Sequence, residues 1–117
     1  MPLDLRIVQG IILSLERARE AGDASVRADR TTASTDDQDC YPRGLQLKLD
    51  RKDPKWIALR QVSMNFDWVN LNVRAQYLQV QPTLPTKFRL TQLGYLESVA
   101  ESLSRDGINC NADVNWH

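Results

Sequence analysis

Residues 77–97 read Tyr-Leu-Gln-Val-Gln-Pro-Thr-Leu-Pro-Thr-Lys-Phe-Arg-Leu-Thr-Gln-Leu-Gly-Tyr-Leu-Glu and contain the clearest local signals of the chain. Tyr77–Val80 and Lys87–Leu90 are short strand candidates, rich in aromatic and aliphatic residues. Pro82 and Pro85 lack the backbone N–H that a strand ladder needs, so the link between the two candidates is predicted to be a stiff loop. The stretch therefore predicts a small antiparallel hairpin that leads into a helix.

That last helix is predicted to begin at Thr91, whose hydroxyl is suited to capping. Its apolar residues recur at the three-and-four spacing of one helical face, at Leu93, Leu96, Val99, Ala100 and Leu103. Gly107 lies just beyond its end. The tail at 108–117 is polar, shows no regular period in this interpretation, and is expected to be irregular.

The first helix is predicted over residues 3–21, with Leu5, Val8, Ile11, Ile12, Leu15 and Ala18 on its apolar face. Gly22 is expected to end it, because glycine adopts the left-handed conformation of many helix C-termini. Residues 23–44 follow as a polar loop, and the sequence does not show whether that loop is ordered.

The middle of the chain allows two interpretations. Leucines alternate with polar residues over 45–50, which predicts a half-buried strand, and Asp53-Pro54 is typical of a helix start. Within 56–77, a helical stripe (Trp56, Leu59, Val62, Phe66) competes with strict alternation of apolar and polar residues. Whether this segment is helical or stranded stays open at the level of the sequence.

The 77–97 stretch also resembles the C-terminal part of winged-helix DNA-binding domains. The matching residues are Phe88, Leu90, Thr91 and Gly94, which fit an aromatic-x-Leu-Thr-x-x-Gly pattern at a strand-to-helix corner. The resemblance implies a winged-helix-like α+β fold with amphipathic first and last helices. Its small antiparallel hairpin would be the wing, which lies along the phosphate backbone. The sequence departs from the pattern in two ways: 53–76 holds no clear helix-turn-helix, and the turn of the wing has no Arg or Lys.

The alternative is an antiparallel sheet of about four strands flanked by the two terminal helices. Its strands would be 45–50, 56–66, 69–80 and 86–91. Such a sheet could bind single-stranded nucleic acid through its aromatic side chains, or it could be a compact partner-binding domain. Both interpretations treat residues 1–117 as a single domain, as the length of the chain suggests.

A net charge of zero conceals a basic middle. Residues 43–91 contain nine basic and three acidic side chains, whereas 1–42 contain five basic and eight acidic ones and 92–117 contain one basic and four acidic. A basic middle between acidic ends favours an anionic partner, most commonly nucleic acid.

The winged-helix interpretation assigns this charge to double-stranded DNA. The candidate contact residues are Lys55, Arg60, Asn72, Arg74, Lys87 and Arg89. Lys55, Arg60 and Arg74 would contact the major groove and phosphates. Lys87 and Arg89 would contact DNA from the wing. Asn72 and Arg74 would read bases if 66–77 were helical. The expected function is that of a small, homodimeric, DNA-binding transcriptional regulator.

A protein-interaction module on a similar scaffold (an adaptor, a subunit or an inhibitor) is the alternative function. Zero net charge, the acidic run around Asp36 and the aromatic ring of Trp116 near the chain end favour it. In that case Trp116 is the candidate partner-binding residue.

Composition argues against several other functions. The one histidine is His117, and neither a metal-ligand spacing nor a glycine-rich phosphate loop occurs, so we expect no metal, no cofactor and no enzymatic activity. No apolar run is long enough to span a bilayer and no signal peptide is evident, which predicts a cytoplasmic protein without a membrane partner. Cys40 and Cys110 read as two reduced thiols, and a disulfide between them is the alternative.

Overall fold

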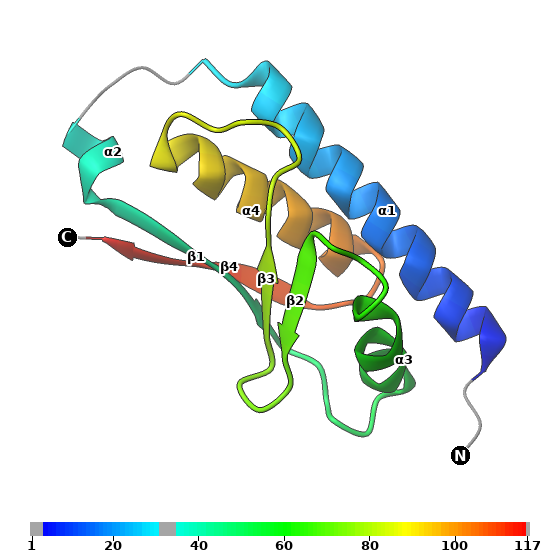
Figure 1. Ribbon diagram of the computed structural model, residues 1–117. Helices are drawn as coiled ribbons and strands as arrows, with labels where there is room; N and C mark the ends of the chain where they lie inside the picture. Colours follow the sequence, from blue (N-terminus) through cyan, green and yellow to red (C-terminus); the bar gives the residue numbers. More distant parts are fainter. Residues whose placement is uncertain (1–3, 31–34, 117) are drawn as a thin grey trace.

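The computed structural model describes residues 4–30 and 35–116 of the chain. The elements are α1 (Leu5–Ala28), α2 (Thr35–Asp39), β1 (Cys40–Leu47), α3 (Pro54–Ser63), β2 (Val69–Asn72), β3 (Tyr77–Val80), α4 (Arg89–Arg105) and β4 (Cys110–Trp116) (Figure 1).

The four strands form one antiparallel sheet in the order β2-β3-β1-β4. After α1 and α2 the chain runs β1-α3-β2-β3-α4-β4, so each of the two later long helices connects strands that are not adjacent in the sheet. This is the split β-α-β arrangement. The predicted α+β class is confirmed, and so is a four-stranded antiparallel sheet, although its strands differ from those expected.

The core lies between the sheet and its helices. Leu45 and Leu78 pair across β1 and β3, and both are fully buried together with Val99 of α4. Helix α1 packs along α4 and against α3 (Figure 1). Its apolar face buries Ile11, Leu15 and Ala18, as the three-and-four spacing predicted.

Helix α1 does not end at Gly22, contrary to the prediction. It continues to Ala28, and Gly22 is buried in its middle. A Cβ atom there would stand 2.6 Å from Cδ2 of Tyr95 and 2.9 Å from Cγ2 of Val99. The glycine is therefore explained by the close approach of α1 to α4 and not by a left-handed terminus.

The predicted polar loop at 23–44 is also largely wrong. Residues 23–28 complete α1, 35–39 form the short α2, and 40–44 begin β1, while 31–34 lie outside the described residues. The strand predicted at 45–50 is thus shifted: it starts earlier, at Cys40, and ends at Leu47.

The ambiguous segment 56–77 contains both a helix and a strand. Asp53 caps α3 as expected, its side chain accepting from the N–H of Lys55, and Pro54 occupies the first turn. Trp56, Leu59 and Val62 then fall on the buried face of the helix, so the strand alternative for 56–66 is wrong. The alternation over 69–80 is that of β2 and β3, but the chain reverses between them, with Gln76 at a φ of 49°.

Tyr77–Val80 is a strand as predicted, whereas Lys87–Leu90 is not, so no hairpin joins these two segments. Helix α4 begins at Arg89, and its N-cap residue Phe88 makes no capping bond through its side chain. The Asp37 carboxylate instead accepts from the N–H of Leu90 at 3.0 Å. Thr91, expected as the cap, is buried and donates its hydroxyl to Asp29 at 2.5 Å.

The tail predicted to be irregular is the edge strand β4. Cys40 pairs with Trp116 at one end of the β1–β4 ladder, and Leu47 pairs with Cys110 at the other. The two cysteines therefore lie at opposite ends of the ladder, far beyond the Cα separation that a disulfide tolerates. Both thiols are free, in agreement with the predicted pair of reduced thiols.

Candidate nucleic-acid interface

One face of the sheet is not covered by any helix of the described chain. Along each strand the residues that alternate with the core residues point to this side, which we call the open face. Its residues are Tyr41, Arg43, Gln46, Asn70, Asn72, Tyr77, Gln79, Asn111, Asp113 and Asn115. Amides and tyrosines dominate it, which is the side-chain chemistry that reads and stacks on bases.

The Tyr77 side chain extends from β3 across β1 to β4. Gly44 of β1 has no side chain, and a Cβ there would stand 2.7 Å from Cε1 of Tyr77 and 3.0 Å from the carbonyl oxygen of Leu78. The ring therefore occupies the space that a side chain on β1 would fill. Its hydroxyl donates to the Asp113 carboxylate on β4 at 3.0 Å. The ring is thus attached to the central strand β3 at one end and hydrogen-bonded to the edge strand β4 at the other.

The environment keeps the Tyr77 hydroxyl protonated. Burial, followed by the hydrogen bond to Asp113 and the negative charge of that carboxylate, raises the pKa of Tyr77 to about 12. The nearby Arg43 guanidinium acts in the opposite direction on this pKa. The hydroxyl therefore remains a donor to Asp113 through the physiological pH range.

Amide side chains border the ring where β2 pairs with β3. Asn72 stands opposite Tyr77 and Asn70 stands opposite Gln79. With Arg74 they line a hollow of about 440 Å³ on the open face. The Asn72 side-chain oxygen already accepts from the N–H of Ala75 at 3.1 Å, so its NH₂ group is the part that remains to contact a ligand. Asn70 and Gln79 are both exposed.

Cations surround this hollow. Arg74 is exposed in the β2–β3 turn, and its carbonyl oxygen accepts from the Arg51 guanidinium at 2.9 Å, which brings a second exposed arginine to the same end of the sheet. Lys48 directly follows β1 at this end and is exposed as well. Arg43 lies on the other side of Tyr77. Phosphate groups of a strand crossing the sheet would meet positive charge on both sides of the ring.

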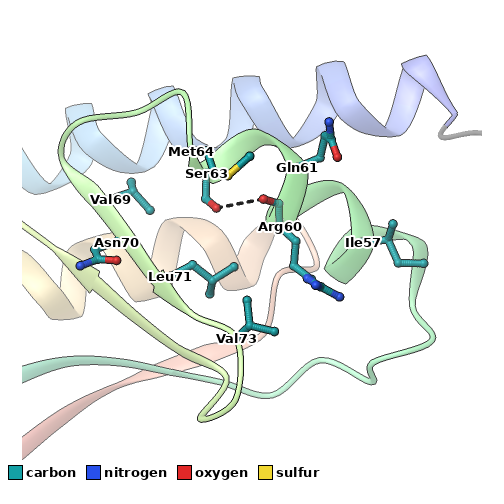
Figure 2. Close-up of a pocket in the computed structure, with 9 residues that line it drawn as sticks. All are labelled: Ile57, Arg60, Gln61, Ser63, Met64, Val69, Asn70, Leu71 and Val73. Carbon is teal, nitrogen blue, oxygen red and sulfur yellow. Dashed lines mark hydrogen bonds between the residues drawn. The ribbon is translucent and has the colours of Figure 1, made fainter.

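The structure separates the predicted contact residues into four places, of which the start of α4 is the last. Asn72 and Arg74 lie at the hollow on the open face. Arg60 lines a groove on the other side of β2, between that strand and α3, as Figure 2 shows. Lys55 is half-buried near α1, with its ammonium 3.5 Å from the carbonyl oxygen of Gly107.

Lys87 and Arg89 lie at the start of α4, and both already contact the protein. The Lys87 ammonium lies 5.3 Å from the centre of the Phe88 ring. The Arg89 guanidinium stacks on the Tyr41 ring at 4.4 Å and donates to the Gln38 carbonyl oxygen at 2.8 Å. The Arg89 side chain thus fastens α4 to the α2–β1 junction.

Trp116, the predicted partner-binding residue, ends β4 with 53% of its surface exposed. It borders a shallow hollow with Val114 of the same strand and Leu93 of α4. Its role toward a partner stays a prediction.

Sequence reasoning missed how Tyr77, Gly44 and Asp113 combine. The sequence predicts Tyr77 only as the first residue of a short strand, and it predicts an irregular tail where Asp113 lies. One signal was available: Cys110, Ala112, Val114 and Trp116 alternate with Asn111, Asp113 and Asn115, which is the period of a strand. The small side chain of Ala112 makes that alternation inconspicuous.

Within the described residues, no group of three or more His, Cys, Asp or Glu side chains is placed to hold a metal ion. None of the helices in the described part of the chain combines the length and the apolar character that crossing a membrane requires. No family model, no curated protein and no solved structure matches this chain. Its function must therefore be argued from the geometry of the molecule itself.

Proposed function

We propose that this protein binds single-stranded nucleic acid on the open face of its sheet, without catalysing a reaction. The observation that carries the proposal is the Tyr77 ring, which lies over Gly44 on the central strands and is anchored to Asp113. A fixed, partly exposed ring at the centre of a sheet offers a surface on which a base can stack.

Three properties of the surroundings support the same ligand. Amides at Asn70 and Gln79 can donate to and accept from base edges. Arg43 and Arg74 can contact phosphates on either side of the ring, and Asp113 is the one acidic residue of the open face. The hollow of about 440 Å³ beside Tyr77 leaves space for a base. An unpaired strand exposes the base faces that such a surface recognises, whereas a duplex keeps them stacked.

The test is fluorescence anisotropy of a labelled twelve-nucleotide strand, titrated with protein at low and moderate salt. We expect binding that weakens as salt rises, because phosphate contacts release counterions. Tyr77→Leu retains an apolar side chain over Gly44 but removes the planar ring. It should weaken binding about 5- to 150-fold, which corresponds to the roughly 1–3 kcal/mol of one stacked base.

Tyr77→Phe is the matched control, because it keeps the ring and loses only the hydroxyl. Its affinity should stay within about threefold of the wild type, since stacking needs only the aromatic face. Equal affinities for Tyr77→Leu and wild type, or no binding at low salt, would refute the proposal. A labelled duplex in a parallel titration tests the DNA-binding regulator that the winged-helix resemblance implies, which remains a prediction.

A further inference from the structure

On the helix-facing side of β2, a groove of about 430 Å³ runs between this strand and α3 (Figure 2). Its walls are mainly apolar. Ile57 of α3 and Met64, the residue after this helix, are 44% and 81% exposed. From β2 and the turn after it come the half-buried Leu71 and Val73. Large apolar side chains exposed around one groove are typical of a site that binds another molecule.

A single charge lies in this groove. Arg60 is exposed and is the one ionisable residue among those that line it, so the groove is electrostatically positive. Figure 2 shows its side chain extending between Ile57 and Val73, so the guanidinium lies beside the apolar walls. A ligand that places an acidic group next to an apolar side chain would match both features.

The strand that borders the groove is an edge of the sheet. β2 pairs with β3 on one side only. The N–H of Gln81 donates to the Trp68 carbonyl oxygen at 3.0 Å, which makes Trp68 and Gln81 a hydrogen-bonded pair next to the ladder. Because such pairs alternate along antiparallel strands, the N–H and C=O of Leu71 point away from β3, toward the free edge.

The edge also lacks the features that usually prevent further pairing. Val69–Asn72 reads Val-Asn-Leu-Asn and contains no proline and no charged residue. The only feature of β2 that opposes pairing with a further strand is its short length of four residues. The backbone of a further strand could pair here while alternate side chains enter the groove.

From these features we infer that the groove between α3 and β2 binds an extended peptide segment of a partner protein, added as a fifth strand beside β2. Apolar side chains of the segment contact Ile57, Met64 and Leu71, and an Asp or Glu of the segment pairs with Arg60. Asn70, Leu71 and Val73 line both this groove and the Tyr77 hollow, so the two sites adjoin at β2, whereas Ile57, Arg60 and Met64 line the groove alone.

The ligand class can be found by selecting a phage-displayed library of random nine-residue peptides on the wild-type protein. We expect enrichment of sequences in which apolar residues alternate with others and an acidic residue recurs at one position. A synthetic peptide of the consensus should shift the amide resonances of Val69–Asn72 and of α3. Methylating the peptide nitrogen that faces Leu71 should abolish binding, because it removes a ladder donor.

Arg60→Glu should weaken this peptide at least tenfold, and replacing the acidic residue of the peptide by Lys should restore the affinity for that variant. Arg27→Glu is the matched control, since Arg27 is also exposed in the last turn of a helix but lies on α1, and it should change nothing. Tyr77→Leu should likewise leave peptide binding unchanged. Failure to enrich any peptide, equal binding to Arg60→Glu, or resonance shifts confined to other elements would overturn the inference.

Discussion

The Tyr77 side chain depends on two other residues for its position on the open face. Gly44 provides the space beneath the ring, and Asp113 accepts from the hydroxyl on the far strand. These three residues come from β3, β1 and β4, so the ring is fixed by the sheet as a whole. Because the ring is already ordered in the free protein, a base that stacks on it would lose little side-chain entropy from the protein.

The raised pKa of Tyr77 predicts how stability depends on alkaline pH. The folded protein holds this proton up to a pKa of about 12, whereas the unfolded chain releases it near 10. The contribution of the Tyr77 hydroxyl to the free energy of unfolding is therefore complete below pH 10 and is lost as the pH rises from 10 through 12. Urea unfolding at pH 9 and pH 11.5 should show a larger loss of unfolding free energy in the wild type than in Tyr77→Phe.

Tyr95 remains in both proteins of this comparison, and burial raises its pKa as well, so the difference between them isolates Tyr77. Asp113→Asn provides a second check. It removes the negative charge that the hydroxyl faces, and the pKa of Tyr77 should fall toward 10. An equal loss of stability in wild type and Tyr77→Phe would show that the hydroxyl is not held as described.

Among the described elements, α1 and α4 form the most extensive helix–helix contact, and Gly22 allows them to approach at Tyr95 and Val99. Gly22→Ala gains about 1 kcal/mol of helix propensity but places a methyl group against the Tyr95 ring and Val99. Overpacking of this kind costs roughly 1–3 kcal/mol, so the net effect should be destabilising. A lower urea midpoint with an unchanged m-value would confirm it.

Gly10→Ala is the matched substitution in the same helix. Gly10 is exposed, and a Cβ there would meet nothing within 4 Å. Only the propensity gain remains, so this variant should be stabilised by up to about 1 kcal/mol. If both alanine substitutions stabilised the protein equally, the inference that α4 approaches Gly22 too closely for a Cβ atom would be contradicted.

The elements that sequence reasoning predicted correctly are those whose signals are local. The apolar stripes of α1 and α4, the Asp53-Pro54 start of α3 and the strand at Tyr77–Val80 need no knowledge of the rest of the chain. The start of α4 depends instead on a distant partner. Asp37, from α2, bonds the N–H of Leu90, and no pattern near Thr91 reveals this bond.

The candidate site was less predictable than the fold for the same reason. The prediction that Asn72 and Arg74 read bases required a helix over 66–77, and the structure has strands there instead. The two residues nevertheless lie together at the hollow. The role of Gly44, however, depends on the register that places it next to Tyr77 and opposite Asp113. Strand order and register are properties of the whole sheet, and a single sequence does not specify them.

At the scale of the whole molecule, α1 is an additional helix that packs on the two helices of the split β-α-β unit. It packs on α4 and α3, and its residues Ile11, Leu15 and Ala18 belong to the same core cluster as Leu45 and Leu78 of the sheet. That shared core is the physical reason to expect residues 1–117 to unfold as one domain. Of the nine basic residues of the middle, four lie on the open face or at its rim, namely Arg43, Lys48, Arg51 and Arg74.

Leu15→Ala tests this integration of α1. Leu15 is fully buried, and its truncation should cost about 2–5 kcal/mol, a large share of the roughly 5–15 kcal/mol that stabilises a typical domain. Leu13→Ala, at a position 52% exposed on the same helix, should change stability by less than about 0.5 kcal/mol.

Urea unfolding followed by far-UV circular dichroism reports the helices, and tryptophan fluorescence reports the buried Trp56 and Trp68. The two transitions should coincide in wild type and should shift together in Leu15→Ala, because α1 and the sheet share one core. A Leu15→Ala protein whose circular dichroism changed at low urea while its fluorescence transition stayed in place would instead show that α1 folds on its own and merely rests on the remaining domain.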